Sequence, residues 1–340
     1  MMRWDESQSF PTELFKKLAG LGMMGVLVPT KYGGSGLGYF EYVTIISEIS
    51  KVCGSIGLSV AAHNSLCVGH ILKFGSEEQK QKWLPKLCSG ESLGAWALTE
   101  TGTGSDALRM DTTALKKDDK WVLNGTKNWI TNGSTASTYL VIAQTDADKG
   151  HKGINVFILE KGMPGFEISA KEDKLGIRGS DTHTLVFNDV KVPKENRVGY
   201  DGFGFKFAMK TLAGGRIGIA AQALGIAAGA YELSLSYSKE RETFGKPINQ
   251  HQSIQFKLAD MYVDIENARN LVYKAAWHKD QKMDYNLSGA IAKLHASEVA
   301  MRTTIEAVQI HGGYGYVKEY HVERLMRDAK ITQIYEGTSE

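Results

Sequence analysis

The last residues of the chain place a carboxylate where it could act as a base. The sequence ends ITQIYEGTSE, residues 331–340, in which Glu336 stands between Tyr335 and Gly337. A carboxylate can remove a proton from carbon when burial raises its pKa toward the working pH. On these residues alone, Glu336 could equally be one charge on a fraying end, so both interpretations stay open.

A glycine-rich stretch, residues 99–106 (TETGTGSD), could bind phosphate. Gly102, Gly104 and Ala107 match the spacing of a dinucleotide fingerprint. That fingerprint needs a helix directly after the glycines, whereas the residues up to Leu123 have the pattern of a turn and a strand. A Rossmann domain is therefore not expected. The loop could still hold phosphate or a flavin edge with its amides and hydroxyls, although a plain turn also explains it.

Other stretches are ambiguous when each is taken alone. Trp129, in NWITNG, could simply cap a core, and Arg241, in RETFG, could end a helix in solvent. His311, in QIHGGYGY, has no second ligand at metal spacing.

The elements that must position these groups follow a helical, β, helical order. Apolar residues have helical spacing up to about Ser89, strand spacing from about Leu93 to Asn196, and helical spacing from Gly204 onward. We expect an α+β multidomain chain with an N-terminal helical domain (1–92), a middle antiparallel β domain (93–202) and a C-terminal helical bundle (203–340). A flat cofactor could bind where the β domain meets the second helical domain.

Within the β domain, Asn124-Gly125 predicts a tight turn that folds residues 121–131 into a hairpin closed by NWITNG. Further strands are expected at 139–144, 154–160, 166–170 and 184–190, and short turns between them favour an antiparallel sheet. In the C-terminal domain, Gly218, Gly225 and Gly229 weaken a long helix. They therefore indicate close helix packing or close approach of a ligand. The apolar segment 217–235 contains polar residues and is interpreted as a packed helix rather than a membrane span.

Composition narrows the class of protein. The 40 basic and 38 acidic residues give a net charge of +2, without a basic block, so nucleic acid is not an expected partner. Cys53, Cys67 and Cys88 lack the CxxC spacing of a metal site, and their odd number argues against a disulfide framework, so we expect buried reduced thiols. No transit or signal segment is visible at the start. We expect a bacterial cytoplasmic protein, or one of the mitochondrial matrix if the source is eukaryotic.

Taken together, the motifs resemble the acyl-CoA dehydrogenase family over essentially the whole chain. They occur in the family's order: LTE (98–100) with GSD (104–106), WIT (129–131), Arg241 with Phe244-Gly245, QIHGG (309–313) and YEGT (335–338). The stretches HNSL (63–66), KLGIRGS (174–180) and GRIGIA (215–220) are most similar to its short-chain, butyryl-CoA branch.

The resemblance implies FAD as cofactor, and it assigns residues to two groups. One group lines the flavin and includes Trp96, Leu98, Thr99, Gly104, Ser105, Trp129, Ile130 and Thr131. The other meets the phosphates and adenosine, partly across a subunit boundary: Arg241, Phe244, Gln252, Gln309, Ile310, Gly312, Gly313, Thr338 and Glu340. Ser105, Arg216, Tyr335 and Gly337 are implied substrate contacts.

The resemblance also implies a reaction. Glu336 would remove the α-proton of an acyl-CoA thioester while a β-hydride passes to flavin N5, giving the trans-2-enoyl-CoA. The backbone N–H of Glu336 and a ribityl hydroxyl would stabilise the enolate-like oxygen. Some relatives carry the base one residue before Arg216, but Gly215 cannot serve. The implied partners are an electron-transferring flavoprotein and further copies of the chain in a homotetramer.

Some features depart from the family pattern. Ala213 stands where the short-chain branch usually has an aspartate, so a polar contact to CoA is in doubt. The chain also lacks the family's first helical segment and the helix that normally follows position 340, which suggests a fragment. Alternative functions are an acyl-CoA oxidase, which would be longer, and a non-catalytic scaffold that keeps the flavin fold.

Overall fold

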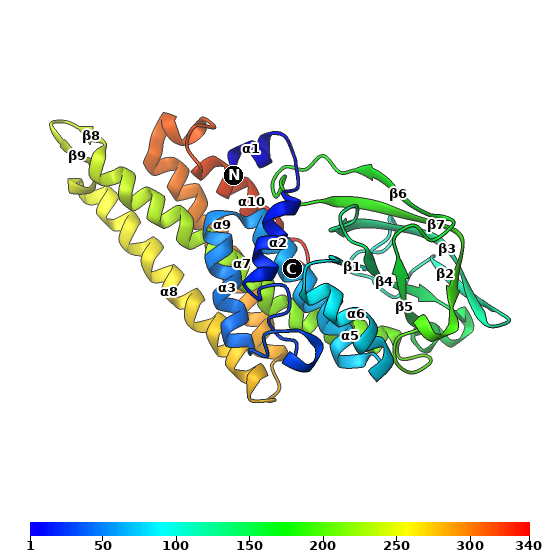
Figure 1. Ribbon diagram of the computed structural model, residues 1–340. Helices are drawn as coiled ribbons and strands as arrows, with labels where there is room; N and C mark the ends of the chain where they lie inside the picture. The colour runs from blue at the N-terminus through cyan, green and yellow to red at the C-terminus, as the bar shows by residue number, and fades with distance from the viewer.

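The computed structural model describes all 340 residues. Figure 1 shows the β-sheet on one side of the molecule and the long helices on the other, and this confirms the expected helical, β, helical architecture. The N-terminal helices are α1 (Met2–Glu6), α2 (Thr12–Gly20), α3 (Tyr39–Val52), α4 (Gly54–Ala61), a π-helix (Ala62–Val68), α5 (Gly69–Phe74) and α6 (Glu77–Cys88).

The middle segment forms one mainly antiparallel sheet. Its strand order is β1-β4-β2-β3-β7-β6, with β5 also paired to β4, and the β1–β4 pairing is parallel. The strands are β1 (Gly94–Ala97), β2 (Thr113–Lys117), β3 (Lys120–Thr131), β4 (Thr138–Gln144), β5 (Ile154–Glu160), β6 (Phe166–Lys171) and β7 (Thr182–Pro193).

The predicted hairpin at Asn124-Gly125 is wrong. Residues 120–131 form the single strand β3, which pairs with β2 on one side and β7 on the other, and the chain turns instead at Asp118-Asp119. The register to β7 slips between Leu123 and Gly125, as in a β-bulge. Gly125 has φ +143°, and a Cβ there would overlap Thr112. The glycine therefore allows a bulge and a close backbone approach inside a strand, and NWITNG lies at the end of β3.

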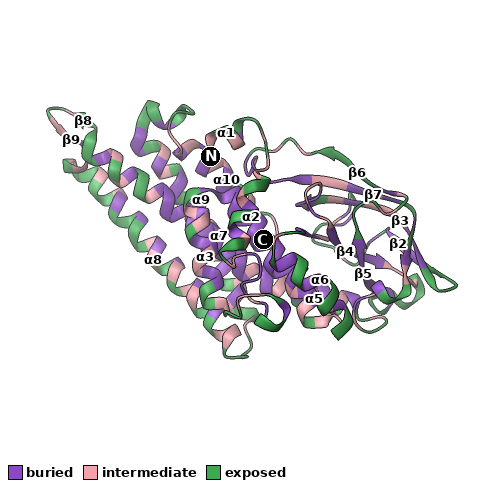
Figure 2. Cartoon of the chain, in the orientation of Figure 1, coloured by how far each residue is buried: buried purple, intermediate pink, exposed green.

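The C-terminal segment contains the three longest helices of the chain, α7 (Gly204–Glu240), α8 (Gln252–Asp280) and α9 (Asn286–His311), followed by the short α10 (Val322–Lys330). A small hairpin of β8 (Glu242–Thr243) and β9 (Lys246–Pro247) lies between α7 and α8. Figure 2 shows that α7 is buried along much of its length. By length and composition α7 and the segment Gly54–Phe74 could each cross a membrane, but 78% and 89% of their apolar windows are buried inside the protein. Both therefore serve as core helices.

Two of the α7 glycines allow close packing of helices. A Cβ on Gly225 would lie 2.8 Å from Ser50 Cβ, and one on Gly229 would lie 3.0 Å from the carbonyl carbon of Lys51, both on α3. Gly218 instead meets a side-chain tip, with the Tyr42 hydroxyl 2.5 Å from its Cβ position. Helix packing thus explains Gly225 and Gly229, whereas Gly218 belongs to a second set of α7 glycines at the candidate site.

Candidate active site

Glu336 lies on the turn that follows α10, with its carboxylate against α7. A Cβ added to Gly215 would overlap this carboxylate and would lie 3.1 Å from Leu66 Cδ2 of the π-helix. Glu336 has φ +54° and Gly337 has φ +101°, so two successive residues adopt left-handed conformations. Because Gly215 has no side chain, the turn can bring the carboxylate up to the helix backbone. Glu336 is therefore not a charge on a fraying end.

The environment of the carboxylate favours its protonated form. Its Oε2 is buried and has no hydrogen-bond partner, although the residue as a whole is only half-buried. Burial raises the pKa of Glu336 to about 8, and the positive charges of Lys293 and Arg216 oppose this rise. A carboxyl group with this pKa can gain and lose a proton near neutral pH, as a general base must.

Neighbouring helices hold the turn. Arg216 Nε of α7 donates to the Glu336 carbonyl at 3.4 Å, and Lys293 Nζ of α9 donates to the Gly337 carbonyl. The Tyr335 hydroxyl donates to Gln222 Oε1 of α7. The backbone N–H of Glu336 makes no hydrogen bond within the chain. It is therefore a free donor next to the carboxylate.

A buried ion pair orders the glycine-rich loop. Lys127 Nζ lies 2.7 Å from Glu100 Oε1 and donates to the Leu98 carbonyl at 2.8 Å. The Glu100 carboxylate also accepts from the N–H groups of Asp111 (2.6 Å) and Thr112 (3.1 Å). Burial by itself would raise the pKa of Glu100, but Lys127 and these donors lower it. The Glu100 carboxylate, at the start of the loop, is therefore hydrogen-bonded to Asp111 and Thr112 at its end.

The residues expected to line the flavin lie on β1, the loop after it and the end of β3. Leu98 and Ile130 are buried, Thr99 and Thr131 are half-buried, and Gly104 and Ser105 are exposed. Trp96 Nε1 is buried without a partner, and Trp129 is 60% exposed with φ +61°. Asn132 Nδ2, next to Thr131, donates to the Ser59 carbonyl of α4 at 3.3 Å. The neighbour of Ser59, Leu58, packs in the same apolar cluster as Tyr335, which links this strand end to the Glu336 turn.

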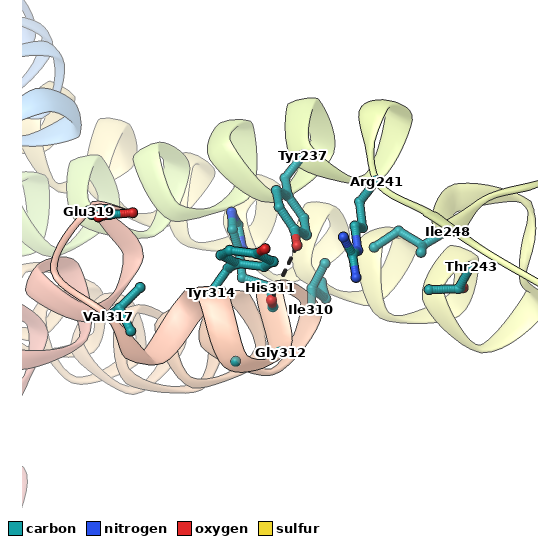
Figure 3. Close-up of a pocket in the computed structure, with 11 residues that line it drawn as sticks. Tyr237, Arg241, Thr243, Ile248, Ile310, His311, Gly312, Tyr314, Val317 and Glu319 are labelled. Carbon is teal, nitrogen blue, oxygen red and sulfur yellow. Dashed lines mark hydrogen bonds between the residues drawn. The ribbon is translucent and has the colours of Figure 1, made fainter.

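The second expected group lies near the far end of α7. A cavity of about 660 Å³ is lined there by Arg241, Ile310, Gly312 and Gly313, together with aromatic residues (Figure 3). The Arg241 guanidinium lies 5.5 Å from the centre of the Tyr314 ring, and Tyr237 stacks on His311 at 4.2 Å. Phe244, Gln252 and Gln309 do not line this cavity, and Phe244 is 97% exposed. Thr338 and Glu340 lie exposed on the C-terminal segment, away from the residues that line this cavity.

The structure does not bring the Arg241 cavity next to the flavin-lining strands within one chain. Arg216 lies within α7 and Arg241 is the C-cap residue of the same helix. A rise of 1.5 Å per residue therefore puts the two residues about 37 Å apart along the helix. Figure 1 shows the β8–β9 hairpin at the opposite end of the molecule from the sheet.

A further cavity, of about 430 Å³, lies on the N-terminal part of α7. Its lining includes Lys206 and Lys210, one turn apart on the helix, and Ala213 and His151. Lys73 lies close enough to Lys210 for the two charges to interact; burial first, and then Lys210, lower the pKa of Lys73. The cavity is therefore basic, and it lies about one helical turn from Gly215.

Several structural residues were not identified from the sequence. Lys127 and Lys293 are buried lysines, and no motif distinguishes a lysine that will be buried. Sequence spacing gave a weak indication that Tyr237 lies near Arg241, because it precedes Arg241 by four residues and such pairs share a helix face.

Known proteins are similar to this chain over its whole length. Three acyl-CoA dehydrogenase domain models match the chain: the N-terminal domain at residues 1–91, the middle domain at 95–190 and the C-terminal domain at 202–340. The chain is 53% identical to a short-chain specific acyl-CoA dehydrogenase of Clostridium acetobutylicum, over 99% of this chain and 89% of that protein.

Solved structures are similar over the same length. Butyryl-CoA dehydrogenase from Megasphaera elsdenii superposes with a TM-score of 0.98 at 52% identity, over 100% of this chain and 90% of that one. A chain solved in work on the electron transferring flavoprotein of Acidaminococcus fermentans has a TM-score of 0.98 at 50% identity, with 99% and 89% covered. A glutaryl-CoA dehydrogenase from Mycobacterium smegmatis, solved with FADH2, has a TM-score of 0.94 at 33% identity, with 99% and 85% covered.

Proposed function

Since the chain belongs to the acyl-CoA dehydrogenase family, we propose that it converts a short-chain acyl-CoA into the trans-2-enoyl-CoA with Glu336 as the base. The observation that carries this proposal is the buried Glu336 carboxylate, which lies against Gly215 with an unpaired oxygen and a pKa of about 8. The family and the enzyme class follow from the comparisons. The choice of a short acyl chain rests on the relatives and on the motifs of the short-chain branch.

The residues on β1 and β3 fit a flavin. Buried Trp96 Nε1 lacks a partner, and Trp129 presents an exposed indole from a strand end that the Glu100–Lys127 pair helps to fix. The expected cofactor FAD agrees with the family, in which the Mycobacterium smegmatis relative holds FADH2. When bound, FAD supplies the acceptor for the hydride that leaves the β-carbon.

The chain itself supplies the groups for proton removal. The Glu336 carboxylate takes the α-proton, and the free N–H of the same residue is available to the thioester oxygen, where negative charge develops. Arg216 and Lys293 hold the turn through its carbonyls. A preorganised donor costs no rearrangement when the charge forms.

The basic cavity on α7 suits the phosphates of coenzyme A. Lys206, Lys210 and His151 provide positive or hydrogen-bonding groups, and α7 leads from them to Gly215. Ala213 contributes a methyl group to this cavity in place of a carboxylate. We therefore expect the acyl-CoA arm to be held here without the polar contact that the family's aspartate would give.

Further copies of the chain would complete the cofactor site. The cavity at Arg241 is too far from the flavin-lining residues to hold the same FAD, so we infer that it serves the FAD of a neighbouring subunit in a homotetramer. Electrons would leave through an electron-transferring flavoprotein, consistent with the similarity to a chain from the Acidaminococcus fermentans work. We place the enzyme in the bacterial cytoplasm.

Anaerobic titration of the purified yellow protein with acyl-CoAs of increasing length tests this function. We expect butyryl-CoA to bleach the flavin and longer substrates to be less effective. An oxidised flavin with every acyl-CoA would exclude the dehydrogenase. Rapid recolouring in air would instead favour an oxidase.

A further inference from the structure

Lys293 of α9 bonds to the Glu336 turn, as Arg216 of α7 also does. The residue is 4% exposed, and its ammonium donates to the Gly337 carbonyl rather than to a carboxylate. Arg216 donates to the preceding carbonyl, that of Glu336. Two cations from two helices therefore bind successive carbonyls of the turn.

The conformation of this turn requires support. Left-handed backbone is unfavourable at a residue other than glycine, and Glu336 at φ +54° is such a residue. A hydrogen bond from a buried ammonium to Gly337 fixes the carbonyl directly after it. Loss of that bond would let the turn relax and move the carboxylate away from Gly215.

The charge of Lys293 also acts on the carboxylate below about pH 8, the value to which burial lowers the pKa of Lys293 itself. Of the ionisable groups around Glu336, Lys293 has the largest effect that lowers its pKa, followed by Arg216. Tyr39 and Tyr42 from α3 are neutral phenols whose pKa values are raised by burial. Lys279 from α8 lies against the neighbouring Gly214.

We propose that Lys293 is a positioning residue for proton abstraction: its ammonium fixes the Glu336–Gly337 turn and supplies the buried positive charge that favours ionised Glu336. This inference rests on the proposed role of Glu336 as the base. It adds a residue whose two contributions, a hydrogen bond and a charge, can be separated by substitution.

A set of variants separates them. Lys293→Met removes both, Lys293→Gln can keep a hydrogen bond to Gly337 without the charge, and Lys293→Arg keeps both. Lys116→Met, at an exposed position of β2, is the matched control. Flavin content and circular dichroism verify folding, and Lys293→Gln serves if the methionine variant does not fold.

The first measurement is the pH dependence of anaerobic flavin reduction by saturating butyryl-CoA. A nearby opposite charge lowers a carboxyl pKa by about 1–3 units. We therefore expect the acid limb to move up by about 1 unit or more in the methionine and glutamine variants, with a roughly tenfold lower rate on that limb. The arginine and Lys116 variants should keep the wild-type profile.

The second measurement needs no substrate. The infrared band of the protonated Glu336 carboxyl, assigned by its loss in Glu336→Gln, is titrated in each variant. Its midpoint should lie near 8 in the wild type and higher when the charge of Lys293 is removed. Equal midpoints in wild type, Lys293→Gln and Lys293→Met would overturn the proposal. Failure of butyryl-CoA to bleach the wild type would instead count against the proposed function, while the infrared titration still decides the role of Lys293.

Discussion

The two ends of α7 make different kinds of site. Near Gly215 the helix meets a carboxylate that its own chain buries, and the turn is held by Arg216 and Lys293. Near Arg241 the helix ends beside an open cavity and a 97% exposed Phe244. In the function proposed above, the first site is built from one chain, whereas the second is completed by a neighbouring subunit. The chemical step and the retention of cofactor should therefore respond to different substitutions.

The largest effect is expected at the Gly215 end. Glu336→Gln removes the base and keeps the size of the side chain, and general-base catalysis contributes about 10²–10⁴-fold. The rate of flavin reduction by butyryl-CoA should fall by this factor while the flavin content stays normal. Reduction at the wild-type rate would place the base elsewhere.

The next effect separates two glycines of the same helix. Gly215→Ala pushes the Glu336 carboxylate from its place, and a displacement of about 1 Å can cost 10²-fold in rate. Alanine also favours the helix, so thermal stability should not fall. Gly225→Ala should instead lower thermal stability and leave the reduction rate unchanged. Its Cβ meets the α3 backbone, and overpacking costs about 1–3 kcal/mol. Rates and melting curves of both variants, side by side, give the comparison. Equal losses of activity in the two variants would show that Gly215 and Gly225 have the same role, contrary to this prediction.

A smaller effect is expected at the open end. Arg241→Ala should weaken FAD retention by about 10–100-fold, the amount that loss of a hydrogen bond to a charged group gives. The flavin reduction rate of the remaining loaded enzyme should be unchanged. Dialysis followed by flavin fluorescence measures retention, with Arg241→Lys as the charge-preserving control. A slowed chemical step with full flavin content would contradict the division between the two ends.

The smallest effect is on stability and its dependence on pH. The pKa of Glu336 is raised from 4.5 to about 8 by burial, so its stabilising contribution is present at low pH and is lost as pH rises toward and through 8. Glu336→Gln cannot ionise. Its free energy of unfolding should match the wild type near pH 5 and exceed it near pH 9, as urea denaturation can measure. A constant difference across this range would mean that the carboxyl group is not buried in solution.

The sequence predicted the order of elements for a good physical reason, whereas Glu336 was expected to be the base only through the resemblance to the family. Apolar spacing distinguishes helix from strand, and Glu336 lay in a motif with glycine directly after it. Asn124-Gly125 misled because the pair suits a tight turn and a bulge equally well, and only the pairing of β3 with both β2 and β7 decides between them.

The supporting residues could not be predicted for a different reason. Lys127 and Lys293 are ordinary lysines in strand and helix patterns, and their roles come from carbonyls and carboxylates distant in sequence. The separation of Arg241 from the flavin-lining residues likewise depends on the unbroken length of α7. Such features depend on tertiary distance, which local patterns do not contain.

The π-helix at Ala62–Val68 has a consequence for how the chain tolerates insertions and deletions. A π-turn is equivalent to an α-helix with one residue inserted, and this segment supplies Leu66 beside Gly215. Removal of a single residue here would let the segment return to α-helical winding, and residues inside the π-turn such as Leu66 would shift by up to about 100° around the helix. We therefore expect a change of one codon, far from Glu336 in sequence, to disturb the contact of Leu66 with the Gly215 region without replacing any residue that has a chemical role.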